Sequence, residues 1–122
     1  MIKRIASALA AVVAAAGLLF VAQPTALASN GSSNGCTYLF VEYTSSGSTR
    51  YINYATASNT CGTYWGFHEI GGVTGPTQNQ GSFTRYYGNV AVQAGGYICA
   101  TSWRHIGGST FERVGAPCTL IA

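Results

Sequence analysis

Short runs of alternating apolar and polar residues, separated by glycine-rich turns, dominate the chain after residue 35. Aromatic and β-branched side chains fill these runs, which is typical of half-buried β-strands. Apolar residues recur at helical spacing nowhere in this part of the chain, and fifteen glycines after residue 28 disfavour a long helix. The pattern therefore predicts strands at 36–43, 49–55, 63–70, 82–87, 89–94, 97–104, 110–114 and 118–121.

These seven or eight short strands predict an all-β fold, a small disulfide-stapled β-sandwich of immunoglobulin-like shape. The longest stretch without a strand pattern is 71–81, and we predict a loop there. A long loop on a cross-linked scaffold is a candidate surface for binding a partner, in addition to the aromatic residues considered below. Residues 29–35 (SNGSSNG) have nothing to bury, so we predict a flexible polar lead. Alternation along the strands assigns four residues to the inward face: Tyr38, Phe40, Ile98 and Ala100.

The N-terminal segment is predicted to be a cleavable signal peptide for secretion. Lys3 and Arg4 precede an almost wholly apolar stretch, 5–22, and a small-x-small site follows at 26–28. A membrane anchor is the alternative, because the apolar stretch is about long enough to span a bilayer. Pro24 and the alanine-rich end favour cleavage. The predicted organisation is a signal peptide at 1–28, the lead at 29–35 and the β-sandwich domain at 36–122.

Four cysteines lie in the predicted mature chain of 94 residues. An even number of cysteines in a small exported domain indicates a disulfide framework, and a core of this size needs such cross-links. Four cysteines allow three pairings. We favour the pairing in which each half of the chain closes its own loop, which joins Cys36 to Cys61 and Cys99 to Cys118.

The predicted mature chain is almost uncharged. Four arginines and three glutamates remain after residue 28, with no lysine or aspartate, for a net charge of +1. Nucleic-acid binding needs a concentrated basic patch, and anionic membranes attract polybasic clusters. We therefore expect neither nucleic acid nor, after signal cleavage, a membrane as partner.

Side chains suited to catalysis are few. His68 adjoins Glu69, but neighbours on a strand point to opposite faces, and His105 falls in a predicted turn. Glu69 and Glu112 are the carboxylate pair that glycoside hydrolysis would need, and nothing in their spacing brings them together. The CxxC and HxxxH spacings typical of zinc sites are absent. We expect no enzyme, no cofactor, no metal and no small-molecule ligand.

The abundance of aromatic residues is the feature of the sequence that points to a binding surface. Residues 29–122 contain fourteen Tyr, Trp and Phe residues, more than a sandwich of this size can bury. Most of these rings are expected in the core, but tyrosine and tryptophan are favoured at protein interfaces. We predict that five of them contact a partner: Tyr64, Trp65, Tyr86, Tyr87 and Trp103.

The run Gly81–Cys118 contains an aromatic-Gly-x-Val strand, Gly-x-x-Cys, Trp-x-x-x-Gly-Gly and a final cysteine. In this order it resembles the spore-associated protein family of actinomycetes, although Gly35–Tyr38 does not reproduce that family's opening. Tyr64–Glu69 (YWGFHE) and Cys99–Trp103 (CATSW) are similar to other small secreted proteins of these bacteria, among them the adaptor subunits of umbrella-shaped toxin particles. The resemblance to the adaptors implies a β-sandwich that links a lectin-bearing protein to a large toxin-carrying polypeptide. Neither family implies catalytic residues.

We therefore expect a secreted, non-enzymatic adaptor that binds secreted protein partners in an extracellular toxin assembly used in bacterial competition. Two alternatives remain open. One is a structural protein of the spore or cell surface. The other is an inhibitor of a secreted hydrolase such as an amylase or protease, because Trp103-Arg104-His105 is similar to the Trp-Arg-Tyr loop of small two-disulfide amylase inhibitors.

Overall fold

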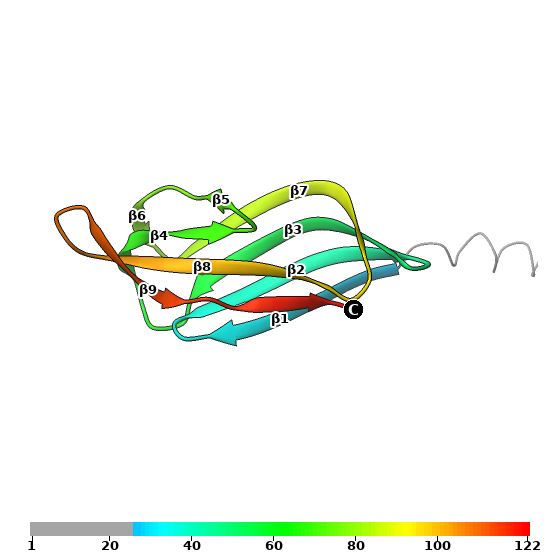
Figure 1. Cartoon of the computed structure of the whole chain (residues 1–122), viewed down its shortest axis with the longest axis horizontal. Coiled ribbons are helices and arrows are strands. Elements are labelled where there is room, and N and C mark those ends of the chain that lie inside the picture. Colours follow the sequence, from blue (N-terminus) through cyan, green and yellow to red (C-terminus); the bar gives the residue numbers. More distant parts are fainter. Residues whose placement is uncertain (1–25) are drawn as a thin grey trace, which may run out of the picture.

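The computed structural model describes residues 26–122, which form two antiparallel β-sheets packed face to face (Figure 1). The first sheet has the strand order β1-β2-β3-β7, and the second has the order β10-β8-β4-β5, with β6 beside β4 and β9 beside β8. The strands are β1 (Ala26–Asn34), β2 (Thr37–Ser46), β3 (Thr49–Asn59), β4 (Tyr64–Ile70), β5 (Val73–Thr74), β6 (Gln78–Gln80), β7 (Ser82–Gln93), β8 (Gly96–Gly107), β9 (Thr110–Gly115) and β10 (Cys118–Ile121).

The all-β sandwich expected from the sequence is confirmed, with ten strands rather than seven or eight. The predicted signal peptide, 1–28, lies outside the described residues except for 26–28, which begin β1. No helix within residues 26–122 is long and apolar enough to cross a membrane.

The segment 29–35, expected to be a flexible lead, instead forms most of strand β1, so that expectation is wrong. Strand β1 pairs with β2 along its whole length. Its side chains also reach β10: Ser32 Oγ donates to the carbonyl of Cys118 at 2.8 Å, and Asn30 Nδ2 donates to the carbonyl of Leu120 at 2.9 Å. The polar residues that suggested disorder thus supply the hydrogen bonds that join the two sheets along this side.

Aliphatic side chains fill the space between the sheets. The buried core consists of Leu39, Val41, Tyr43, Ile52, Ala55, Ala57, Ile70, Ala100 and Ile121. Of the four predicted inward residues, Ala100 is buried and Ile98 packs partly buried against the core.

The inward assignment of Tyr38 and Phe40 is wrong, because β2 turns its opposite face to the core. Apolar residues occupy both faces of β2, so alternation alone could not choose between them. Tyr38 remains 37% exposed, and its ring lies against Gly31 of β1, where a Cβ atom would overlap the phenol. Glycine at that position lets the outer face of the sheet accept a large ring.

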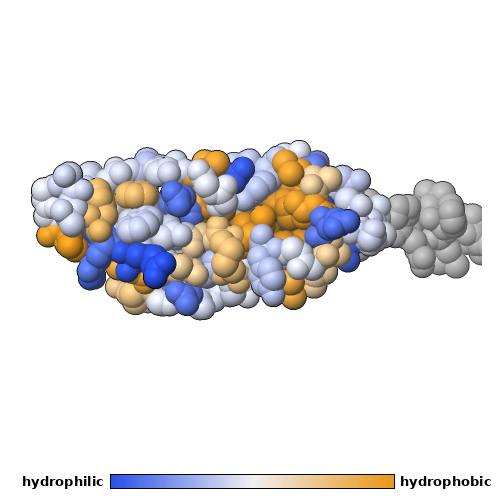
Figure 2. Space-filling model, in the orientation of Figure 1, coloured by the Kyte–Doolittle hydropathy of each residue, from blue (hydrophilic) through white to orange (hydrophobic). Residues whose placement is uncertain are grey.

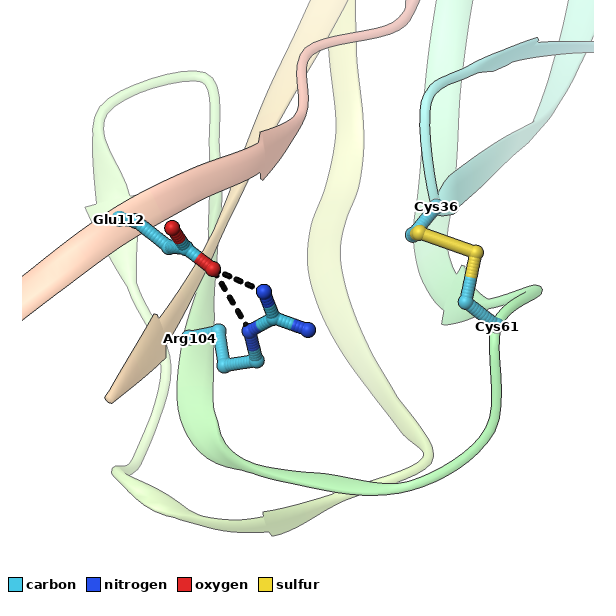
Figure 3. Close-up of polar contacts among 4 residues, drawn as sticks. All are labelled: Cys36, Cys61, Arg104 and Glu112. Atoms are coloured by element: carbon cyan, nitrogen blue, oxygen red, sulfur yellow. Dashed lines mark hydrogen bonds and ion pairs between the residues drawn. A yellow bond between two sulfur atoms is a disulfide. The ribbon is translucent and has the colours of Figure 1, made fainter. Parts of the chain in front are cut away.

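Both predicted disulfides are confirmed. Cys36–Cys61 ties the β1–β2 turn to the connection between β3 and β4 (Figure 3). Cys99–Cys118 joins facing residues of β8 and β10 whose Cα atoms lie 4.0 Å apart. Two disulfides in so short a chain indicate an oxidising, extracellular-type environment.

Strand β7 joins the two strands predicted at 82–87 and 89–94. The chain bends at Gly88 and Asn89, which both have positive φ angles, 65° and 64°. Glycine adopts this conformation without steric cost, and asparagine tolerates it better than most residues. Residues 87–89 of β7 stand opposite the single residue 53 of β3, so the pairing continues on both sides of the bend with a shifted register.

The predicted loop 71–81 contains the short strands β5 and β6. Both pair with β4, so this segment returns along the edge of the second sheet. Gln80 at its end is fully buried and donates from Nε2 to the carbonyl of Pro76 at 2.7 Å. The segment is therefore paired along the margin of the sheet, so the expectation that it has no regular structure is wrong.

Candidate functional site

Strands β4, β8 and β9 bring together aromatic rings on the side of the second sheet that points away from the first. Phe67 of β4 stacks on Trp103 of β8, with ring centroids 6.3 Å apart and planes 23° apart. Phe111 of β9 meets Phe67 edge-on at 5.2 Å and His105 edge-on at 5.3 Å. Trp65, two residues before Phe67 on the same side of β4, is 54% exposed. We call these five residues the aromatic face.

Gly66 sets the spacing of this face. It lies between Trp65 and Phe67 and is paired with Arg104 of β8. A Cβ atom at this position would overlap the carbonyl oxygen of Trp103. Only glycine therefore lets β4 approach β8 closely enough for Phe67 to stack on Trp103.

The two charged residues that join β8 and β9 lie on the reverse side of the sheet from the aromatic face. Arg104 Nε donates to Oε1 of Glu112 at 2.8 Å, and Arg104 Nη2 contacts the same oxygen (Figure 3). Both side chains are about half exposed, so the pair adds little to stability. Arg113, opposite Trp103 in the β8–β9 pairing, is exposed and is the charged residue nearest to the rings in register.

Of the five residues predicted to contact a partner, the structure brings together Trp65 and Trp103 alone. Tyr86 is 80% exposed but lies on the outer side of the first sheet, where its ring centroid is 6.1 Å from that of Tyr54. Phe40 lies 6.1 Å from Tyr54 on its other side. Tyr86 thus belongs to a separate row of rings.

Tyr64 and Tyr87 have structural positions. Tyr64 turns inward, and burial raises the pKa of its phenol. The guanidinium of Arg85 lies 4.1 Å from the Tyr87 ring centroid and donates to the carbonyls of Ile70 and Gly71, at 3.0 and 2.9 Å. Tyr87 therefore helps to anchor the end of β4 to β7.

Three members of the aromatic face were missed by the sequence reasoning: Phe67, His105 and Phe111. A signal for two of them was present, since Trp65-x-Phe67 and Trp103-x-His105 each place two rings on one side of a strand. Phe111 comes into contact through the β8–β9 pairing, which a sequence pattern does not reveal.

His68 and Ser102 form a hydrogen-bonded pair between the sheets. His68 Nδ1 lies 2.5 Å from Ser102 Oγ, and both residues are fully buried. Within residues 26–122, Nε2 of His68 is buried without a hydrogen-bond partner. Burial lowers the pKa of His68, since it penalises the charged imidazolium. A pair enclosed in this way is a core contact and has no route to a substrate.

We predict that this histidine makes the fold less stable in mild acid. Its pKa is lower in the folded than in the unfolded protein, so the unfolded state binds the proton first as pH falls. The free energy of unfolding should decrease between pH 7 and pH 5, by at most about 1.4 kcal/mol per pH unit. Urea unfolding at several pH values measures this slope. His68→Gln should flatten it and the control His105→Gln should not; equal slopes in both variants would contradict the prediction.

The remaining titratable groups are dispersed. Glu69 lies on the outer side of β4 and accepts from Thr74 Oγ1 at 3.4 Å, whereas Glu112 lies on the reverse side of the sheet with Arg104. His105 is hydrogen-bonded within the β8–β9 hairpin, with Nε2 at 2.6 Å from the carbonyl oxygen of Gly108. No group of three histidine, cysteine or acidic residues within the described chain could hold a metal ion.

Comparisons with models of protein families, with curated proteins and with solved structures find no match to this chain. The function is therefore inferred from the surfaces of the chain itself. Four rings of the aromatic face, those of Trp103, Phe67, Phe111 and His105, form the longest chain of ring contacts among the described residues.

Proposed function

We propose that the protein is a secreted, non-catalytic binding module that contacts another secreted protein through the aromatic face. The observation that carries this proposal is the contact of Phe67 with both Trp103 and Phe111 beside the exposed Trp65. Tryptophan is enriched among the few residues that supply most of the binding energy of protein interfaces, and rings already packed against each other lose little entropy on binding. The low charge of the chain favours a partner recognised by ring contacts rather than by salt bridges.

The wider role that we propose is that of an adaptor in an extracellular toxin assembly used in bacterial competition. The apolar N-terminal segment supports export, and the two disulfides support a stable fold outside the cell. An adaptor must hold two partners at once, so it needs a second surface well separated from the aromatic face.

The alternative of a hydrolase inhibitor is less well supported. Its sequence basis is the similarity of Trp103-Arg104-His105 to an inhibitory loop. In the structure, however, Arg104 points away from its two neighbours and is paired with Glu112. The three side chains therefore do not form one contact surface.

Substitution of Trp65 by alanine tests the proposal. The tagged protein should capture at least one secreted protein from the culture medium of the producing organism. Trp65→Ala should weaken that binding at least tenfold, the effect expected when an interface hot spot is truncated. Titration of the purified partner by calorimetry measures it.

Tyr86→Ala provides the matched control, since Tyr86 is more exposed than Trp65 but lies on the other sheet. It should leave the affinity unchanged. Recovery of the free monomer alone, or equal effects of the two substitutions, would overturn the proposal.

A further inference from the structure

A second exposed surface lies at the far end of the sandwich from β9 and the aromatic face, where a short turn joins β7 to β8 (Figure 1). It is a cavity of about 450 Å³, with Val92, Ile98 and Ile121 contributing its apolar lining. Figure 2 shows an apolar area at this end of the molecule. Val90 is exposed on β7 close by, and Tyr97 of β8 is 64% exposed at the rim. We call this surface the β7–β8 groove.

The groove is open because β4 is shorter than β8. Strand β4 pairs with β8 between Ala100 and Arg104, and the amide of Gly71 then donates to the carbonyl of Cys99 at 2.9 Å. Beyond that point the chain turns away into β5. Within the described residues, positions 96–98 of β8 have a neighbouring strand only on the β10 side.

The free edge of β8 offers unpaired backbone groups. The amide of Ala100 donates to the carbonyl of Pro117 at 2.9 Å, so Ala100 points to the β10 side, as Ile98 does in the same ladder. Successive residues of a strand direct their N–H and C=O groups to opposite edges. The N–H and C=O of Tyr97 therefore point into the groove. Strand β7 also ends its own sheet, so one of its edges is unpaired among residues 26–122 as well.

We propose that the β7–β8 groove binds an extended, uncharged segment of a partner protein, which pairs with β8 at Tyr97 and covers the half-buried side chains of Val92 and Ile98. The addition of a strand to a free sheet edge combines backbone hydrogen bonds with pockets for alternate side chains. The inference rests on the proposed function and gives the adaptor its second surface.

Charge and size identify this occupant. None of the eight residues that line the cavity is charged, so the lining itself offers no counter-ion to a charged segment. Arg50, opposite Val92 on β3, lies beside the groove, but its guanidinium donates to the carbonyls of Ala122, Gly47 and Thr49. Eight residues line the cavity, and the N–H and C=O of Tyr97 at its edge suit a strand that adds to β8. One extended strand fits a groove of this size.

A displayed library of random nine-residue peptides, panned against the folded and oxidised protein, tests the proposal. The enriched peptides should alternate apolar with small uncharged residues. In a nuclear magnetic resonance titration they should shift the amide signals of Tyr97 and Cys99. They should also slow hydrogen exchange at Tyr97 at least tenfold at saturation.

Two substitutions at one position separate backbone pairing from side-chain contact. Tyr97→Pro removes the N–H that faces the groove and leaves the β10 ladder intact, a position at which an edge strand tolerates proline. It should weaken peptide binding at least tenfold. Tyr97→Ala should stay within about threefold of the parent, since it keeps the backbone hydrogen bonds through which an added strand binds. Val90→Lys, which adds a charge beside the groove, should also weaken peptide binding. If the proline variant does not fold, this variant tests whether the peptide binds in the groove.

Three results would overturn the inference: no enriched peptide, equal affinity for Tyr97→Pro and Tyr97→Ala, or no effect of Val90→Lys. Peptides whose binding depends on Trp65 but not on Tyr97 would also overturn it. They would leave the proposed function of the aromatic face standing, so the two failures can be told apart.

Discussion

Gly66→Ala is expected to destabilise the fold by about 3 kcal/mol or more. The new Cβ atom would overlap the carbonyl oxygen of Trp103 and lie 3.0 Å from a ring carbon of Tyr64. The carbonyl belongs to the backbone of the neighbouring strand, so it can move away only if the β4–β8 ladder opens. Overpacking of this kind is among the few single-residue changes with large effects on stability. For a domain of this size the loss corresponds to a fall of about 12 °C or more in Tm.

Gly81→Ala is the matched control. No atom lies within 4 Å of a Cβ built on Gly81, and its φ is outside the left-handed region. This variant should keep the Tm of the parent within about 3 °C. Thermal unfolding followed by circular dichroism measures both variants, and tryptophan fluorescence reports on the rings of the aromatic face. Similar Tm values for the two variants would show that β4 can move away from β8 without loss.

The sequence predicted the sandwich and its cross-links because these depend on local signals. Alternation identifies strands, and the spacing of the cysteines favours closure of one loop in each half of the chain. Strand β1 carries neither signal. Its polar residues form a strand because β2 offers a free edge on one side and Ser32 and Asn30 bond to β10 on the other. These are long-range contacts, and no local pattern of residues contains them.

The candidate site could be predicted only in part, because local signals reveal aromatic residues but not the contacts between strands. Aromatic abundance identified Trp65 and Trp103, but neighbouring rings on one strand, such as Tyr64 beside Trp65, were not separated into buried and exposed members. That choice depends on which side of β4 faces the other sheet. The groove at Tyr97 was not predicted at all, because it results from the difference in length between β4 and β8.

Removal of the Cys99–Cys118 cross-link should lower the free energy of unfolding about as much as Gly66→Ala does. It should also loosen strand β10 locally. The double variant Cys99→Ser/Cys118→Ser opens a loop with a sequence separation of 19, for which chain entropy predicts a loss of about 3 kcal/mol. Strand β10 has only four residues, yet it supplies the buried Ile121. Without the cross-link the strand should open before the rest of the domain unfolds, and Ile121 should leave the β7–β8 groove.

The double variant Cys36→Ser/Cys61→Ser separates the local effect from the global one. Its disulfide closes a loop of comparable length, with a sequence separation of 25, but joins two connections rather than an edge strand. Both double variants should lose about 3 kcal/mol in urea unfolding. Only the Cys99/Cys118 variant should show hydrogen exchange at Thr119 and Ile121, whose amides face β8 in the ladder, that is faster than global unfolding allows. Equal protection of these two amides in both variants would mean that the ladder with β8 and the side-chain bonds from β1 hold β10 in place without the disulfide.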